Sequence, residues 1–177
     1  GLLGYIPTFE ELENPNSNLA SEIYSEDGAL IGKYDIENRS NTRFSELDPK
    51  LVHALLATED IRFYKHSGID FKAVIRAFSG AVVGQNKGGG STITQQFAKL
   101  LFHERADSKT KRILQKLNEW VIAVKLEQRY SKDEIIALYL NKFDFVNNAV
   151  GIKSAAKIYF NTSPDSLKLE ESAVLVG

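Results

Sequence analysis

The sequence contains no cysteine and no methionine, and only 4 of its 177 residues are proline. Without cysteine there can be no disulfide framework, no thiolate metal site and no cysteine nucleophile. No stretch approaches the roughly 20 consecutive apolar residues of a membrane-spanning helix, and the N-terminus does not have the order of a signal peptide. These absences predict a chain that is soluble or only peripherally attached to a membrane.

An excess of charge of one sign is also lacking, because 22 Lys and Arg residues nearly balance 23 Asp and Glu residues. A dedicated nucleic-acid-binding protein usually carries a marked basic excess, so we expect no nucleic-acid partner. With 43% apolar residues, the chain is too hydrophobic for a disordered segment and long enough to bury a core. It begins at Gly1 without methionine and ends at Gly177 within an apolar stretch, so we interpret it as an excised segment.

The pattern of apolar residues predicts a mainly α-helical fold with a small N-terminal β-hairpin. Residues 1–18 mix prolines, acids and scattered apolar residues, which is typical of a linker, and a domain is expected over 19–177. Two β-prone runs, 20–24 and 29–36, flank the turn-forming residues 26–28. This is the only convincing strand signal in the sequence.

Helical spacing and capping residues recur after Ser45. Helix starts are expected at Asp48-Pro49, Asp70, Ser91 or Thr92, Ser131 with Glu134, and Gly151. A polar stretch at 103–111 is the best candidate for a loop. A last helix is predicted to begin within 167–176.

The first segment that could carry chemistry runs from Glu59 to Gly68. Glu59 falls at the C-terminal end of an apolar helix, where the helix dipole and apolar neighbours would both favour its protonated form. That environment suits a general base or acid. The alternative is an exposed carboxylate paired with Arg62 one turn later, and the local pattern by itself favours this alternative. His66 is interpreted as a helix-end residue.

The second segment is a glycine run, 88–90, followed by Ser91 and Thr92. A helix that starts here would point backbone N–H groups and two hydroxyls at an anion such as phosphate or pyrophosphate. Gln96 and Lys99 follow on roughly one face of that helix. The alternative is a flexible loop with an ordinary helix cap, and the pattern is not a P-loop.

The third segment places Arg112, Lys116, Glu119 and Ala123 on one stripe of a long helix. A carboxylate would project among cations there, beside a small residue that leaves room for a ligand. The opposite side of the helix carries Ile113, Leu117, Val121 and Val124. The alternative is a solvated face with paired charges. Tyr139 and the aromatic residues after Gly151 are interpreted as core packing.

Taken in order, these segments resemble the motifs of the peptidoglycan glycosyltransferase family, glycosyltransferase family 51. This is the lysozyme-like polymerase domain of class A penicillin-binding proteins and monofunctional transglycosylases. The matching segments are 59–68, 89–96, 119–141, 151–160 and, for the start of a fifth motif, 171–175. Each motif is weak by itself, but their order and spacing are specific.

The resemblance implies polymerisation of lipid II, a lipid-pyrophosphate-linked disaccharide pentapeptide, into β-1,4 glycan strands by inverting glycosyl transfer. It implies that Glu59 is the general base and that Glu119 is a second catalytic carboxylate that organises the donor pyrophosphate, directly or by holding Mg²⁺. It also implies binding of the inhibitor moenomycin near Lys116. The residues expected to bind substrate or pyrophosphate are Asp60, Ser91, Thr92, Gln96, Lys99, Arg112 and Lys116.

The sequence departs from the family at Gln115, where an arginine is usual, and Arg112 one turn earlier is a possible substitute. The family usually has Ala-Ala where Ser172-Ala173 stands, and its final helices are expected to lie beyond this chain.

The resemblance further implies partners and a location for the protein. The expected partners are lipid II, the growing glycan strand, the cytoplasmic membrane surface, a C-terminal transpeptidase domain and cell-wall synthesis proteins. The expected location is the outer, periplasmic face of the bacterial cytoplasmic membrane, with an N-terminal anchor helix outside this chain. Two other functions compete with polymerisation: a lysozyme-like or lytic glycosidase, and a non-catalytic scaffold domain that binds lipid II or cell-division proteins.

Overall fold

A computed structural model describes residues 21–24, 30–34, 41–82, 89–101, 108–147 and 149–177. The chain divides into two compact units, 1–40 and 41–177. In the first unit, β1 (Ser21–Tyr24) pairs antiparallel with β2 (Leu30–Tyr34), with Ser21 opposite Tyr34 and a register shift at Ile23/Tyr24. The predicted linker and the predicted turn at 26–28 lie outside the described residues.

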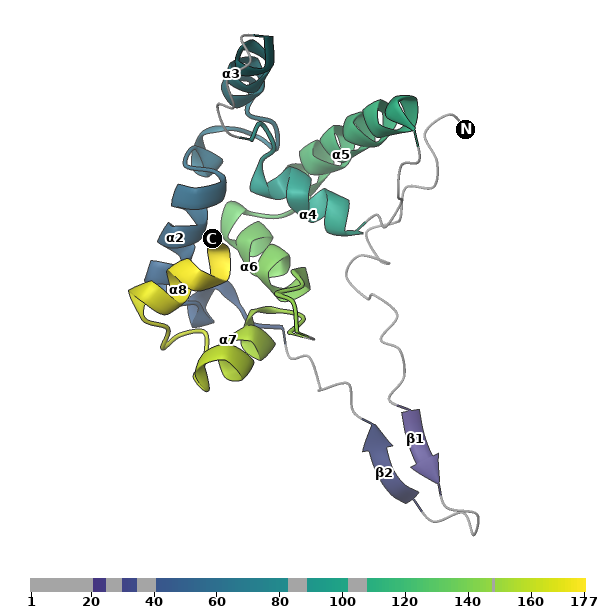
Figure 1. Cartoon of the computed structure of the whole chain (residues 1–177), viewed down its shortest axis with the longest axis vertical. Coiled ribbons are helices and arrows are strands. Elements are labelled where there is room, and N and C mark those ends of the chain that lie inside the picture. Colours follow the sequence, from purple (N-terminus) through teal and green to yellow (C-terminus); the bar gives the residue numbers. More distant parts are fainter. Residues whose placement is uncertain (1–20, 25–29, 35–40, 83–88, 102–107, 148) are drawn as a thin grey trace. The chain divides into compact units, whose positions relative to one another are not determined.

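The second unit is mainly helical, as predicted (Figure 1). Its elements are η1 (Phe44–Glu46), α2 (Pro49–Glu59), η2 (Phe63–Lys65), α3 (Phe71–Val82), α4 (Ile93–Leu101), α5 (Lys109–Arg129), α6 (Lys132–Lys142), α7 (Ile152–Phe160) and α8 (Leu169–Val176). None of the helices in the described ranges combines the length and apolar character of a membrane span.

The predicted capping residues begin their helices. Asp48, the residue before Pro49, accepts a hydrogen bond from the Lys50 amide, and Asp70 accepts one from the Ala73 amide. Ser131 and Glu134 form the predicted capping box of α6. The predicted loop at 103–111 is wrong at its end, because Ser108 caps α5 and the helix starts at Lys109. Residues 102–107 lie outside the described residues.

Helix α6 lies at the centre of this unit, in contact with η1, α4, α5 and α7, while α2 packs against α8 (Figure 1). The centre of this unit is apolar. Among the described residues, its large, fully buried aliphatic side chains are Leu51, Leu55, Ile93, Leu126, Ile135, Ile136, Leu140, Ile152 and Leu167. Helix α3 projects from this group of helices in Figure 1. The core therefore holds α2, α4 and α6 together, and these are the helices that present the residues of the candidate site.

Two motif residues serve this packing. The Asn141 amide donates to the Thr42 carbonyl and accepts from the Thr42 N–H, which ties the start of the unit to the end of α6. Gly151 has a φ of 86°, and a Cβ there would lie 2.8 Å from the Asn141 carbonyl oxygen. Only glycine fits this junction between α6 and α7 without strain.

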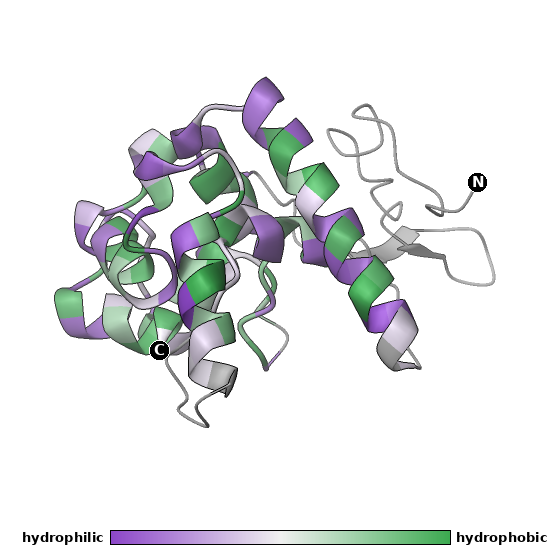
Figure 2. Ribbon diagram, turned by 90° about the horizontal axis from the view of Figure 1, so that it is seen from above, coloured by the Kyte–Doolittle hydropathy of each residue, from purple (hydrophilic) through white to green (hydrophobic). Residues whose placement is uncertain are grey.

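Helix α5 carries the two predicted stripes on opposite sides, and the structure shows which of them faces the protein. Glu119 and Ala123 are buried, whereas Ile113, Leu117 and Val121 on the opposite side are exposed. Figure 2 shows apolar and polar residues alternating along this long helix. Glu119 and Ala123 face the protein because α4 packs against α5 on that side, where Ser91 contacts Lys116. The room predicted beside Ala123 is absent, since Ala123 is fully buried and its backbone lies against Gly68.

Candidate active site

Glu59 is the last residue of α2, and its carboxylate is exposed. The expected desolvation by apolar neighbours is therefore wrong. The alternative pairing with Arg62 is also wrong, because the Arg62 guanidinium binds the Asp70 carboxylate. The amide nitrogen of Gln96, on α4, instead donates to Oε2 of Glu59 at 2.6 Å. Glu59 thus has a neutral partner and access to solvent, which suits a group that exchanges a proton with a ligand.

Gln96 also contacts Tyr139, a residue that sequence reasoning assigned to core packing. Tyr139 on α6 is 3% exposed, and its hydroxyl donates to Oε1 of Gln96 at 3.1 Å. Burial, and then the negative charge of Glu59, raise the pKa of Tyr139. The two contacts of Gln96 span 37 and 43 residues of sequence, so no local spacing could have revealed them.

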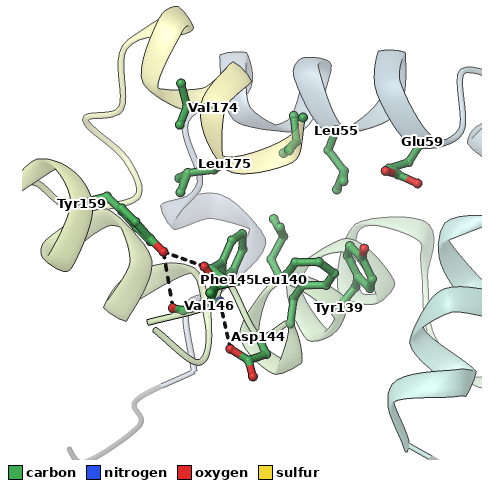
Figure 3. A pocket seen from close by; sticks show the side chains of 13 residues that line it. Leu55, Glu59, Tyr139, Leu140, Asp144, Phe145, Val146, Tyr159, Val174 and Leu175 are labelled. Carbon is green, nitrogen blue, oxygen red and sulfur yellow. Dashed lines mark hydrogen bonds between the residues drawn. The ribbon is translucent and has the colours of Figure 1, made fainter. Parts of the chain in front are cut away.

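Glu59 and Tyr139 line a cavity of about 390 Å³. Figure 3 shows these two residues at one end and Tyr159 at the other. The lining is mostly aromatic and aliphatic, and it includes Leu55, Leu140, Phe143, Phe145, Val174 and Leu175. Aromatic faces next to carboxylates are a suitable surface for a ligand with apolar faces and hydroxyl groups. A ligand in this cavity would lie beside the Glu59 carboxylate.

The second predicted carboxylate lies in a different environment. Glu119 is 7% exposed, and its Oε2 is 2.9 Å from Nζ of Lys116. The same Nζ donates to the Ser91 hydroxyl at 2.8 Å. The structure thus brings Ser91 to Lys116 and Glu119 at the junction of α4 and α5. The half-exposed ammonium group is available to a negatively charged ligand.

The backbone amides at the start of α4 are less available than the glycine run predicts. The buried Asp60 carboxylate accepts the Ile93 amide, and the Thr92 hydroxyl oxygen accepts the Gln95 amide. Thr92 is itself buried, and its hydroxyl donates to the Gly68 carbonyl at 2.6 Å. Asp60 and Thr92 therefore position α4. The sequence motifs predict that both bind substrate, but in the structure both are buried and have partners within the protein.

The remaining predicted cations are both exposed. Lys99 lies in the last turn of α4, and Arg112 lies near the start of α5. Neither takes part in the ion pair between Lys116 and Glu119. Gln115, which stands in place of the family's usual arginine, is half-buried.

A separate group, Asp60, His66 and Asp70, brings potential metal-ligating atoms within 4.8 Å of one another. Its carboxylates already have partners: a ring nitrogen of His66 lies 3.0 Å from Asp60, and the Arg62 guanidinium pairs with Asp70. We therefore interpret this group as an internal hydrogen-bond network, with one ion pair, that joins α2, α3 and α4. His66 is the C-cap residue of η2, the helix-end position that the sequence predicts, and its largely buried side chain also contacts Asp60.

Comparison with known proteins gives a consistent result. A family model described as transglycosylase matches residues 27–177. The chain is 38% identical over 182 residues to penicillin-binding protein 1A of Escherichia coli (strain K12), covering 100% of this chain and 21% of that protein. It is 40% identical over 173 residues to penicillin-binding protein 1A of Neisseria gonorrhoeae, and 38% identical over 175 residues to that of Pseudomonas aeruginosa. Each of these two matches covers 97% of the chain and 21% of the relative, so the chain spans about a fifth of the length of these relatives.

Proposed function

Because the chain belongs to the transglycosylase family, we propose that it is a peptidoglycan glycosyltransferase that polymerises lipid II into β-1,4 glycan strands. The observation that carries this proposal is the pair of unlike carboxylates. One is exposed at the end of an aromatic-lined cavity, and the other is buried beside a lysine. An inverting transfer needs both a base for the acceptor and positive charge for an anionic leaving group.

Glu59 acts as the general base in this proposal. Its carboxylate removes the proton of the acceptor sugar's 4-hydroxyl as that oxygen attacks the anomeric carbon of the donor. The bond from the anomeric carbon to the pyrophosphate oxygen breaks, and undecaprenyl pyrophosphate leaves with the bonding electrons. The exposure of Glu59 and its position in the cavity wall support this role.

The cluster of Ser91, Lys116 and Glu119 serves the donor pyrophosphate. The Lys116 ammonium and the Ser91 hydroxyl are donors suited to phosphate oxygens. In this proposal Glu119 would hold Mg²⁺, because this ion commonly takes one or two carboxylates together with substrate phosphate oxygens. When bound, the ion would neutralise charge that develops on the leaving group. Lys99 and Arg112, exposed on adjoining helices, add positive charge for the incoming donor.

The protein works at a membrane surface in this proposal. Phe71, Ile75 and Phe78 on α3 are between 63% and 73% exposed, and Ile113 and Leu117 on α5 are also exposed. Apolar faces of this kind, with Lys and Arg on the same helices, favour contact with a lipid surface. This supports contact with a membrane surface. The outer, periplasmic face of the cytoplasmic membrane, an anchor helix, a transpeptidase domain and cell-wall synthesis partners belong to the proposal through the family membership.

The same proposal includes a lysozyme-like fold for residues 19–177 and a small hairpin formed by β1 and β2, preceded by a linker over 1–18. The helical arrangement around α6 and the antiparallel pairing of the two strands support it.

The experiment that tests the function is a gel of products formed from purified lipid II by the full-length protein, with and without Mg²⁺. We expect long glycan strands that depend on the divalent ion. Preformed glycan that becomes shorter would instead identify a glycosidase. Binding of lipid II without any turnover would identify a scaffold domain.

A further inference from the structure

Gln96 bridges two groups that lie on different helices, the Glu59 carboxylate on α2 and the Tyr139 hydroxyl on α6. Its two contacts are 2.6 Å to Oε2 of Glu59 and 3.1 Å to the hydroxyl oxygen of Tyr139. We propose that Tyr139 is a positioning residue, which orients the Gln96 amide so that its N–H group holds the ionised Glu59 carboxylate toward the cavity. This inference rests on the proposed function only for the role of Glu59 as the base.

The direction of the two hydrogen bonds follows from the chemistry of the groups. An ionised carboxylate can only accept, so Gln96 must turn its amide nitrogen toward Glu59. The carbonyl oxygen of the amide then faces Tyr139, which must donate. Burial and the charge of Glu59 raise the pKa of Tyr139, so the phenol keeps its proton and remains a donor. The two hydrogen bonds of Gln96, one to Glu59 and one to Tyr139, form a bridge, and each of them requires the same orientation of the amide.

The bridge compensates for the exposure of Glu59. A carboxylate at the end of a helix and open to solvent would sample several rotamers, and only some would face an acceptor hydroxyl. The bond from Gln96 occupies Oε2 and leaves Oε1 for the acceptor. Because Gln96 is half-buried and Tyr139 lies within the core, the rigid centre of the protein fixes an exposed catalytic group.

Other groups near Glu59 do not supply this function. Its neighbour Asp60 is buried and turned toward His66, and Asp144, which lines the same cavity, accepts the Val146 amide. Helix α8 lines the cavity with Leu175 and other apolar residues. The acid and base behaviour of Glu59 should therefore respond most strongly to the bridge.

The test compares Tyr139→Phe with Tyr159→Phe in the full-length protein. Both tyrosines line the cavity, but the Tyr159 hydroxyl donates to the Phe145 carbonyl and has no part in the bridge. Without its hydroxyl partner, the Gln96 amide can rotate and release Glu59. We expect Tyr139→Phe to lower kcat about threefold to tenfold, with KM changed by less than about twofold. We also expect the acid limb of the kcat profile to move to higher pH by about half a unit, a shift that Tyr159→Phe should not produce.

A double variant separates positioning from a structural role. If Tyr139 acts through Gln96, adding Tyr139→Phe to Gln96→Ala should cause no further loss of kcat. Independent, additive losses would overturn the proposal. An acid limb that stays in place in Tyr139→Phe would overturn it too, because a purely structural defect lowers the amount of active protein without moving that limb.

A direct measurement makes this inference separable from the proposed function. The titration of the Glu59 carboxyl carbon can be followed by NMR in protein labelled with ¹³C-glutamate, without any substrate. A midpoint that rises in Tyr139→Phe but not in Tyr159→Phe supports the bridge even if the protein makes no glycan. An unchanged midpoint rejects the bridge even if polymerisation is confirmed.

Discussion

The two carboxylates of the candidate site lie in opposite environments. Glu59 ends α2, is exposed, and contacts the neutral amide of Gln96. Glu119 lies within α5, is 7% exposed, and contacts the charged Lys116. The Lys116 ammonium balances the charge of Glu119, whereas Glu59 has a neutral partner and access to solvent. The difference teaches that chemically identical side chains obtain separate tasks from their partners.

The two regions also differ in what holds them. Glu59 is fixed through side chains, Gln96 and Tyr139, whereas Glu119 is fixed by close contact between backbones. Gly68 has a φ of 88°, and a Cβ on it would lie 2.9 Å from the carbonyl carbon and oxygen of Ala123, one turn after Glu119. Variants can therefore disturb one carboxylate and spare the other.

The largest effect is expected for Glu59→Gln. Removal of a general base typically lowers the rate by about 10²–10⁴-fold, so glycan synthesis should become undetectable. The free energy of unfolding should change by less than about 0.5 kcal/mol, because the side chain is exposed and glutamine has its shape. Lipid II polymerisation and urea unfolding measure the two quantities. Glu170→Gln, at an exposed position on α8, is the control, and substantial synthesis by Glu59→Gln would reject the base assignment.

The next effect concerns Lys116→Ala, which removes the partner of Glu119. Moenomycin affinity should fall about tenfold to hundredfold, because a hydrogen bond from a charged group contributes about 1.5–3 kcal/mol. Calorimetric titration measures this affinity. Lys125→Ala, at an exposed position on the same helix, should bind moenomycin normally. If the folded Lys116→Ala variant binds moenomycin as tightly as the parent protein, Lys116 does not contact the inhibitor. The separate role assigned to the Glu119 region would then be rejected.

Gly68→Ala should disturb the Glu119 region selectively. A left-handed backbone conformation and the overlap with Ala123 together should lower the free energy of unfolding by about 2–4 kcal/mol. Gly89→Ala is a matched control, since a Cβ there meets nothing within 4 Å. Urea unfolding compares the two variants. Equal stabilities would mean that α5 moves easily, and that backbone contact does not fix Glu119.

Local signals in the sequence predicted the helix starts well. Asp48, Asp70 and Ser131 cap their helices as expected, because capping involves only the next two or three residues. The buried face of α5 was not predictable in this way, since it depends on packing against α4 and on the approach of Gly68, 55 residues before Ala123. A helix that exposes apolar residues and buries a glutamate contradicts the usual amphipathic rule.

The sequence motifs likewise predicted only part of the site, because the contacts between its residues are long-range. The motifs located Glu59, Gln96, Lys116 and Glu119, and the structure brings these residues into two pairs. Asp60 and Thr92 share those motifs but serve internal packing. Sequence order cannot distinguish a residue that contacts substrate from one that holds the helix beside it.

The smallest expected effect is a change in the pH dependence of stability. It decides whether the fall of activity at acid pH reports protonation of Glu59 or unfolding of the protein. Burial alone would raise the pKa of Asp70, but the Ala73 amide and the Arg62 charge outweigh it and hold the pKa below its ordinary value of 3.8. A lowered pKa in the folded state means that this stabilisation is complete above that value. It is lost as the pH falls through the folded-state pKa.

Asp70→Asn should therefore flatten the loss of stability at acid pH, while the uncharged asparagine still caps α3. At neutral pH the variant should be less stable by only about 1 kcal/mol, because Arg62 is partly exposed. Urea unfolding at about pH 7, 4 and 3 measures the slope. Asp48 and Glu134 also have a lowered pKa, so part of the slope should remain. If the acid limb of kcat shifts together with stability in Asp70→Asn, unfolding rather than Glu59 sets that limb. If the limb stays in place while stability changes, the limb is assigned to Glu59.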